Sequence, residues 1–224
     1  MALSKERTEL AGVIDRLLTN LSLLVTSQTG RDGVELRHQI GNIRSNYYTM
    51  IVDGTFATEL QACFKSAQQA NVKLATLFVV HEGLFDEVPV GEFSAAVVQM
   101  AIIFCLSTES RIITTLKFTN RDDVELMLGK MRGVFDIARV LAADAPDTSA
   151  YQQLTLLAGS LIDHLSNVSR PLPRMVKFSL KASLPSLTLS QLLYYTADRS
   201  EEIVDENKIV HPAFCLRELR GLSA

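Results

Sequence analysis

The side chains of this sequence that could take part in catalysis or metal binding are few and lie far apart. His38, His81 and His164 each stand alone, without a second histidine or a carboxylate at the spacing of metal ligands. His211 precedes Pro212, and neither a serine or cysteine nucleophile nor a second acid stands near it in the sequence. We therefore expect no catalytic residue, no metal site and no cofactor, and we predict that the protein is not an enzyme.

The cysteines and the glycines support the same expectation. Cys63, Cys105 and Cys215 are odd in number and far apart, which excludes a disulfide scaffold and argues against a zinc knuckle. We expect them to be small buried apolar residues. Neither common glycine-rich phosphate-binding motif occurs, and the stretch 158–161 lacks the form of a nucleophile elbow.

The charges of the chain nearly cancel, with 22 Lys and Arg against 25 Asp and Glu. Without a basic excess, direct binding to nucleic acid is not supported. Residues 1–9 lack the pattern of a secretory signal, so we expect the protein to be made and kept in the cytoplasm of the cell that encodes it. The most apolar window, 93–106, is shorter than the roughly 20 residues that span a bilayer, which predicts a buried helix and no membrane partner.

The elements that would position any site are helical over most of the chain. Apolar residues, which make up 47% of the sequence, recur there at steps of three and four, as on one face of a helix turned to a core. We interpret the apolar run 72–80 as helix too, and Ala145-Pro146 as a break. The stretch 119–123 has the cap-type and acidic residues of a helix start. Residues 1–169 are predicted to form an all-helical domain of five to seven helices, with apolar segments over 9–25, 36–50, 56–67, 72–80, 93–106, 124–142 and 154–168, the last opened by a capping box of Ser149 and Gln152.

The character of the chain changes at 170–174, where two prolines in three residues cannot continue a helix and favour an extended linker. Beyond it, 175–180 alternates like a strand, 187–195 has helical spacing, 200–203 opens a short helix, and Leu219 and Leu222 fit a closing strand. The predicted fold class is mainly α, with a helical N-terminal domain (1–169) followed by a small βααβ module (175–224).

The residues of this C-terminal module resemble a degenerate LysM module. The matching positions are leucines and tyrosines of the first helix, the start of the second helix, and an Asn followed by a His-Pro-x-Phe ending: Leu187, Leu189, Leu192, Leu193, Tyr194, Tyr195, Ser200, Ile203, Val204, Asn207, Ile209, His211, Pro212, Phe214, Leu219 and Leu222. With the proline-rich entry at 170–174, the sequence resembles the C-terminal end of the Mu-like phage tail protein called the DNA circularisation protein, over about a quarter of the chain.

Two departures from the LysM pattern bear on function. The Gly-Asp-Thr turn of carbohydrate-binding LysM modules is replaced by residues 183–186, and the glycine that opens their last strand is replaced around 216–218. In that family the sugar groove lies between these two loops. The resemblance therefore implies a structural use of the module more than glycan binding.

The resemblance implies a structural protein of a phage or phage-like contractile tail, located in the virion tail at the baseplate hub or wedge. It would hold neighbouring subunits (hub, tube and wedge proteins) together during assembly, in several copies on a symmetric ring. Adjacent Tyr194 and Tyr195 point about 100° apart on a helix, so at least one should be core. The residues expected to dock are Tyr194, Tyr195, Asn207, His211, Pro212 and Phe214.

Two other functions stay open. The module could bind peptidoglycan as part of a host-interaction protein. The helical domain could also belong to a ligand-binding regulator, although that function requires a basic recognition helix, and the sequence offers none.

Overall fold

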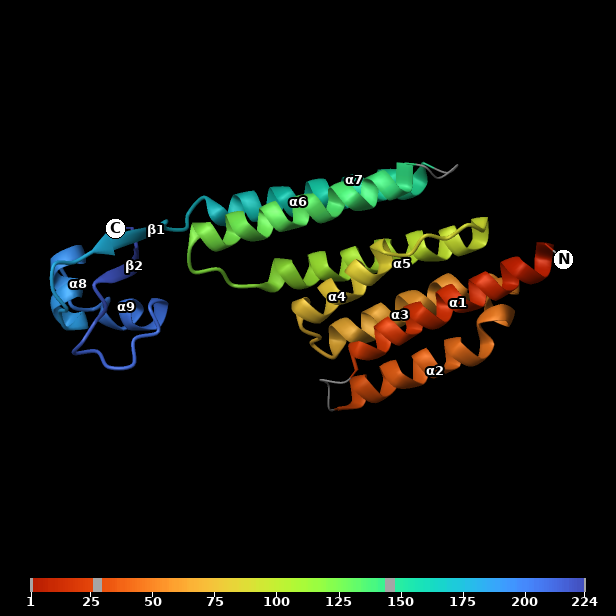
Figure 1. Cartoon of the computed structure of the whole chain (residues 1–224), viewed down its shortest axis with the longest axis horizontal. Coiled ribbons are helices and arrows are strands. Elements are labelled where there is room, and N and C mark those ends of the chain that lie inside the picture. The colour runs from red at the N-terminus through yellow and green to blue at the C-terminus, as the bar shows by residue number, and fades with distance from the viewer. Residues whose placement is uncertain (1, 26–29, 144–147, 224) are drawn as a thin grey trace. The chain divides into compact units, whose positions relative to one another are not determined.

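The computed structural model describes residues 2–25, 30–143 and 148–223, and its fold is mainly α, as predicted (Figure 1). In chain order the elements are α1 (Ala2–Leu23), α2 (Arg31–Val52), α3 (Phe56–Gln69), α4 (Leu74–Phe85), α5 (Glu92–Thr115), α6 (Arg121–Ala143), α7 (Ser149–Ser169), β1 (Met175–Ser179), α8 (Ser186–Tyr194), α9 (Ser200–Glu206) and β2 (Glu218–Leu222). The predicted break at Ala145-Pro146 lies outside the described residues.

The chain divides into two compact units, which are described separately. One consists of Met1–Leu116 and Met131–Ile162, and we call it the helical unit. The other consists of Lys117–Lys130 and Asp163–Ala224 and contains the C-terminal module. The long helices α6 and α7 contribute to both units. The domain boundary predicted at 170–174 stays a prediction.

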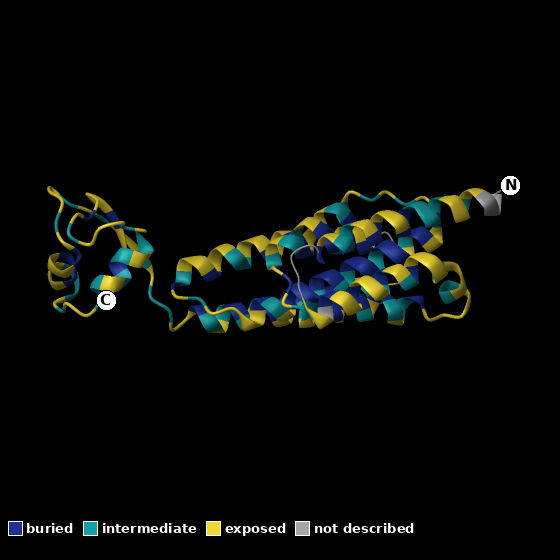
Figure 2. Ribbon diagram, turned by 90° about the horizontal axis from the view of Figure 1, so that it is seen from below, coloured by how far each residue is buried: buried dark blue, intermediate teal, exposed yellow. Residues whose placement is uncertain are grey.

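Helix α5 is the centre of the helical unit, where it contacts α1, α3 and α4, while α2 packs on α1 and α3. The helices turn their apolar stripes inward, which Figure 2 shows as dark blue along their facing sides. The largest fully buried side chains of this unit include Leu18, Leu21, Phe64, Leu106 and Phe135. The predicted helix over 72–80 is confirmed as α4.

The sequence pattern also marks the start of α6 correctly. Asn120 precedes this helix, and its Oδ1 accepts a hydrogen bond from the Asp123 backbone N–H at 2.8 Å. Its Nδ2 donates to Asp123 Oδ2, also at 2.8 Å. This reciprocal pair satisfies a backbone donor that the first turn of a helix otherwise leaves unpaired.

The central helix is longer than the sequence predicts. Helix α5 runs over 24 residues, whereas the apolar window 93–106 suggested about 14. The prediction that this segment is too short to span a bilayer is therefore wrong. Among the described residues α5 is long and apolar enough to cross a membrane, but 56% of its most apolar window is buried within the protein. The polar residues Thr108, Glu109 and Ser110, beyond the apolar window, are buried within the helix.

The C-terminal module has the predicted order of strand, helix, helix and strand. Helix α7 ends at Ser169, immediately before the prolines. Strands β1 and β2 pair antiparallel, with Lys177 opposite Arg220 and Phe178 opposite Leu219. All three cysteines are buried and free, as the sequence predicts.

Candidate docking site

The C-terminal module is built around a small core. Leu189 of α8, Ile203 of α9, Leu219 of β2 and Cys215 before it are buried together. Half-buried apolar side chains surround this cluster: Leu180, Leu184, Leu193, Tyr194 and Ile209. Four buried side chains are few, so every large residue that stays outside this core is a candidate for contact with another molecule.

Tyr194, the last residue of α8, belongs to the wall of this core. The guanidinium of Arg199 stacks over its ring at 3.8 Å from the centroid, and Glu202 holds Arg199 through two hydrogen bonds of 2.9 and 3.0 Å. The Tyr194 hydroxyl is buried without a hydrogen-bond partner among the described residues. Burial raises the pKa of Tyr194 above its ordinary value, helped by the charge of Glu202 and opposed by Arg199. Tyr194 therefore has a structural role in the module.

Tyr195 is placed quite differently. It follows α8 in the left-handed conformation, with φ 60° and ψ 17°, and its side chain is 88% exposed. Glycine or asparagine usually occupies this position after a helix, because a bulky side chain is strained there. An aromatic residue that is strained in its backbone and makes no core contact is a good candidate for binding a partner.

Asn207 follows α9, and its side chain is used inside the module. Its Nδ2 donates to the carbonyl oxygens of Ile203 at 2.8 Å and of Arg220 at 2.7 Å. Its Oδ1 accepts a hydrogen bond from the Arg220 backbone N–H at 2.7 Å. The amide thus ends α9 and pairs with the outer edge of β2, which leaves it little capacity for docking.

His211, Pro212 and Phe214 lie together in the loop between α9 and β2. The His211 carbonyl accepts the Phe214 backbone N–H, and the two rings lie 5.6 Å apart. The Pro212 carbonyl accepts the Ser186 backbone N–H at the start of α8. Phe214 is 72% exposed. The structure therefore holds His211 and Phe214 as one exposed aromatic pair, on a loop anchored through Pro212.

The connection from β1 to α8 and the connection from α9 to β2 are bonded directly to each other. Backbone hydrogen bonds run from Ser186 to Pro212, from Cys215 to Leu184 and from Leu180 to Arg217, and the Ser183 hydroxyl donates to the Cys215 carbonyl at 2.6 Å. These bonds hold the two connections together.

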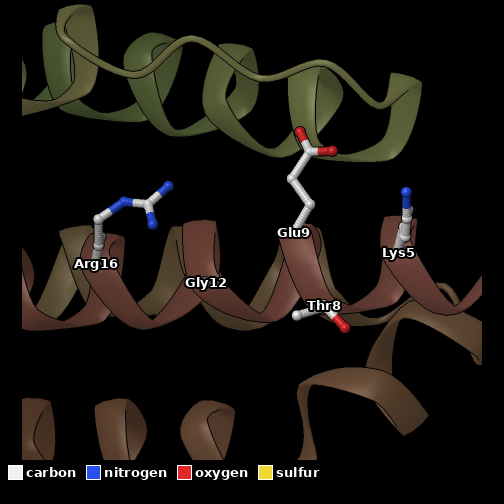
Figure 3. Close-up of a pocket in the computed structure, with 5 residues that line it drawn as sticks. All are labelled: Lys5, Thr8, Glu9, Gly12 and Arg16. Atoms are coloured by element: carbon white, nitrogen blue, oxygen red, sulfur yellow. The ribbon is translucent and has the colours of Figure 1, made fainter.

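A surface hollow of about 340 Å³ in the helical unit is lined by Lys5, Thr8, Glu9, Gly12 and Arg16 of α1. Figure 3 shows Glu9 and Arg16 pointing toward the neighbouring elements. Glu9 Oε1 accepts the backbone N–H groups of Val90 and Gly91 at 2.7 and 3.1 Å, and these bonds lower the pKa of Glu9. Arg16 makes a bidentate pair with Glu87 at 2.6 and 2.7 Å. Both charged groups therefore fasten α1 to the connection between α4 and α5.

Sequence reasoning missed a buried polar pair in the helical unit. His81 of α4 was interpreted as isolated, but its Nδ1 lies 2.7 Å from Oε1 of Glu109 on α5, and both side chains are almost fully buried. The thiol of Cys105 lies 3.6 Å from the same oxygen. Burial, together with the Glu109 carboxylate, raises the pKa of Cys105 well above its ordinary value, so this thiol is a poor nucleophile.

The exposed side chains of the C-terminal module are suited to contact with another molecule more than to catalysis or metal binding. Among the residues that the structure describes, no group of three or more His, Cys, Asp or Glu side chains is arranged so that it could hold a metal ion. No protein-family model matches the chain, and no curated protein matches it either. Of the six predicted docking residues, four are exposed and two, Tyr194 and Asn207, are occupied within the module; the exposed ones are Tyr195, His211, Pro212 and Phe214.

Proposed function

We propose that the protein is a structural component of a phage or phage-like contractile tail, at the baseplate hub or wedge, which holds neighbouring tail subunits together during assembly. The single observation that carries the docking role is the exposure of Tyr195 and Phe214 on a module whose own core is complete without them. Exposed aromatic side chains are the usual anchors of protein interfaces. The assignment to a contractile tail rests on the resemblance of residues 170–222 to the Mu-like DNA circularisation protein.

The alternative, a peptidoglycan-binding module, receives less support. The segment that replaces the sugar-binding turn is itself bonded within the module, through the Ser186–Pro212 and Cys215–Leu184 hydrogen bonds. A pulldown on purified cell wall separates the two functions, because the tail proposal predicts no retention above that of an unrelated helical protein.

The direct test is the composition of tail particles purified from the encoding strain. Mass spectrometry should find the chain at a fixed ratio to the tube protein, and negative-stain imaging with a labelled chain should place it at the baseplate end. Absence of the chain from intact particles would refute the proposal.

A sharper test uses Tyr195, because its structural and docking contributions have opposite signs. Tyr195→Asn places a residue that tolerates the left-handed conformation at φ 60°. We expect this variant to be as stable as the wild type or more stable, by up to about 1 kcal/mol, yet to enter tail particles poorly. The matched control is Tyr151→Ala on α7, another exposed tyrosine, which should enter particles normally. Normal incorporation of Tyr195→Asn would remove this residue from the docking surface.

A further inference from the structure

The two-stranded sheet of the module has two outer edges, and the structure closes only one of them. On β2, the backbone N–H and C=O of Arg220 point away from β1 and are both bonded to the side chain of Asn207. This amide occupies the place of a neighbouring strand, so the outer edge of β2 is closed at its centre.

The outer edge of β1 is open at Lys177 and Ser179. Two hydrogen bonds show which residues of β1 direct their backbone groups toward β2. The Leu180 N–H donates to the Arg217 carbonyl at one end of the strand pair, and the Ser223 N–H donates to the Arg174 carbonyl at the other. In that register Val176 and Phe178 direct their N–H and C=O groups toward β2, and Lys177 and Ser179 direct theirs away from it. The outward N–H of Met175 is already bonded to Asp122. The unpaired edge is therefore confined to two residues, both of them exposed.

The charges on this sheet point to the chemistry of a ligand. Lys177 and Arg220 are directly opposite each other, so their side chains share one face, and neither forms an ion pair with any described residue. Like charges in this position destabilise a strand pair. A hollow of about 490 Å³ lies at this part of the sheet, lined by Lys177, Phe178, Ser179, Asn207, Glu218, Leu219 and Arg220. Glu218, opposite Ser179, supplies the acid in this lining.

The opposite face of β1 has a different character. Val176 is adjacent to Lys177 in the strand, so its side chain points to the other face, where it is 38% exposed. A strand added at the β1 edge would therefore place alternate side chains beside Lys177, with Arg220 one strand farther away on the same face, and beside Val176 on the other face. A second copy of β1 does not fit, because it would bring its own Lys177 against this cationic face.

We propose that the β1 edge receives an extended acidic segment of a partner protein, which adds a third strand to the sheet. The segment alternates acidic residues, on the face of Lys177 and Arg220, with apolar residues on the face of Val176. Main-chain bonds to Lys177 and Ser179 hold the strand, and the side-chain alternation selects it. This inference deepens the proposed docking function, on which its biological setting rests, and it names the kind of segment that a neighbouring subunit contributes.

The test is a fluorescence-anisotropy titration of the full chain against a labelled, blocked peptide of alternating glutamate and valine. We expect binding that is detectable below about 1 mM and weakens with salt, as charge pairing requires. Two control peptides should bind at least about tenfold more weakly, one alternating lysine with valine and one with the same glutamates and valines in separate blocks.

Two variants locate the contact. Ser179→Pro removes an outward N–H while leaving the β1–β2 ladder in place, and we expect it to weaken binding about tenfold, whereas Ser179→Ala should bind as the wild type does. Lys177→Glu should also weaken binding at least about tenfold by reversing the charge. Thermal unfolding checks that the Ser179→Pro variant remains folded. If this variant does not fold, the Lys177→Glu variant alone tests the contact.

The proposal is overturned if the alternating acidic peptide does not bind below about 1 mM, if the lysine peptide binds equally well, or if Lys177→Glu leaves its affinity unchanged. Because this titration needs no tail particle, its failure is distinct from that of the proposed function. If the chain is absent from tails but the peptide binds, the peptide site stands and the proposed function fails. If the peptide does not bind but the chain is present in tails, docking would depend on Tyr195 and Phe214 without the β1 edge.

Discussion

In the helical unit, bulky aromatic side chains such as Phe64 and Phe135 are fully buried, whereas in the C-terminal module Tyr195 and Phe214 lie mostly in solvent. Figure 2 shows the same contrast, with dark blue gathered among the helices and yellow and teal prevailing in the module. The helical unit even buries a polar pair, His81 and Glu109. The difference teaches that the helical unit uses its large side chains for its own stability, whereas the module leaves some of its largest for contacts with other molecules.

The largest expected effect comes from breaking the buried pair of the helical unit. Glu109→Ala leaves the His81 ring buried without its 2.7 Å partner, and should lower the free energy of unfolding by about 3–5 kcal/mol. Urea unfolding followed by circular dichroism measures the loss. Glu109→Gln, which can still hydrogen-bond to His81, should lose less.

The control for this prediction is Glu125→Ala, which removes an exposed pair with Arg121 and should cost only about 0.3–0.5 kcal/mol. If both alanine variants lost similar amounts, the helical unit would not depend on its buried polar pair, and the contrast with the module would weaken.

A smaller loss is expected where the core of the module is tightest. A Cβ at Gly221 would collide with the Tyr194 hydroxyl and would lie 2.9 Å from Phe178 Cε2. Gly221→Ala should therefore destabilise by about 1–3 kcal/mol in a thermal or urea titration. The double variant with Tyr194→Phe should recover part of this loss, because it removes one of the two colliding groups.

Gly159 supplies the opposite case, since nothing lies within 4 Å of a Cβ built on this exposed residue of α7. Gly159→Ala should stabilise by up to about 1 kcal/mol. A Gly221→Ala variant as stable as Gly159→Ala would show that the module is loosely packed at Tyr194.

The smallest effect, and the one that depends on pH, belongs to Tyr194. Burial favours its neutral phenol and raises its pKa in the folded state. This contribution to stability is complete below the ordinary tyrosine pKa of about 10 and is lost as pH rises through the folded-state value. Tyr194→Phe should match the wild type at neutral pH, or exceed it by up to about 1 kcal/mol because an unpaired hydroxyl is gone, and its advantage should grow above pH 10 or so.

Thermal melts at neutral and alkaline pH measure this difference between variant and wild type. The exposed neighbour provides the control, because Tyr195→Phe should show no such growth with pH. An advantage of Tyr194→Phe that shrinks at alkaline pH would mean that the phenol is not buried in the folded module.

Much of the fold follows from local pattern. The steps of three and four predicted most helices of residues 1–169, two continuous apolar runs predicted α4 and α5, and the alternation after the prolines predicted β1. The lengths of the elements were harder to predict. Helix α5 continues past residue 106 because Glu109 lies on its apolar stripe between Cys105 and Ile113, where its charge hid the stripe. A lone acid on such a stripe is the signal that could have revealed a buried partner.

The sequence suggested which residues belong to the candidate docking site, but it did not indicate which of them are exposed. The sequence indicates that one of the two adjacent tyrosines is core, and the structure assigns this role to Tyr194, because α8 ends there and the chain turns left-handed at Tyr195. Asn207 was expected to dock, but its amide closes the edge of β2. The pairing of Lys177 with Arg220 depends on strand register, which the sequence does not state.

By itself the sequence determined the helical class and the strand, helix, helix and strand order of the module, because these depend on periodicity over neighbouring residues. It also indicated the burial of the three cysteines, through their odd number and wide separation. Only the tertiary structure decided that His81 meets Glu109 across 28 residues, that Asn207 covers β2 and that the edge of β1 stays open. Contacts between distant segments depend on how whole elements pack, and the spacing within one element carries no record of its partner.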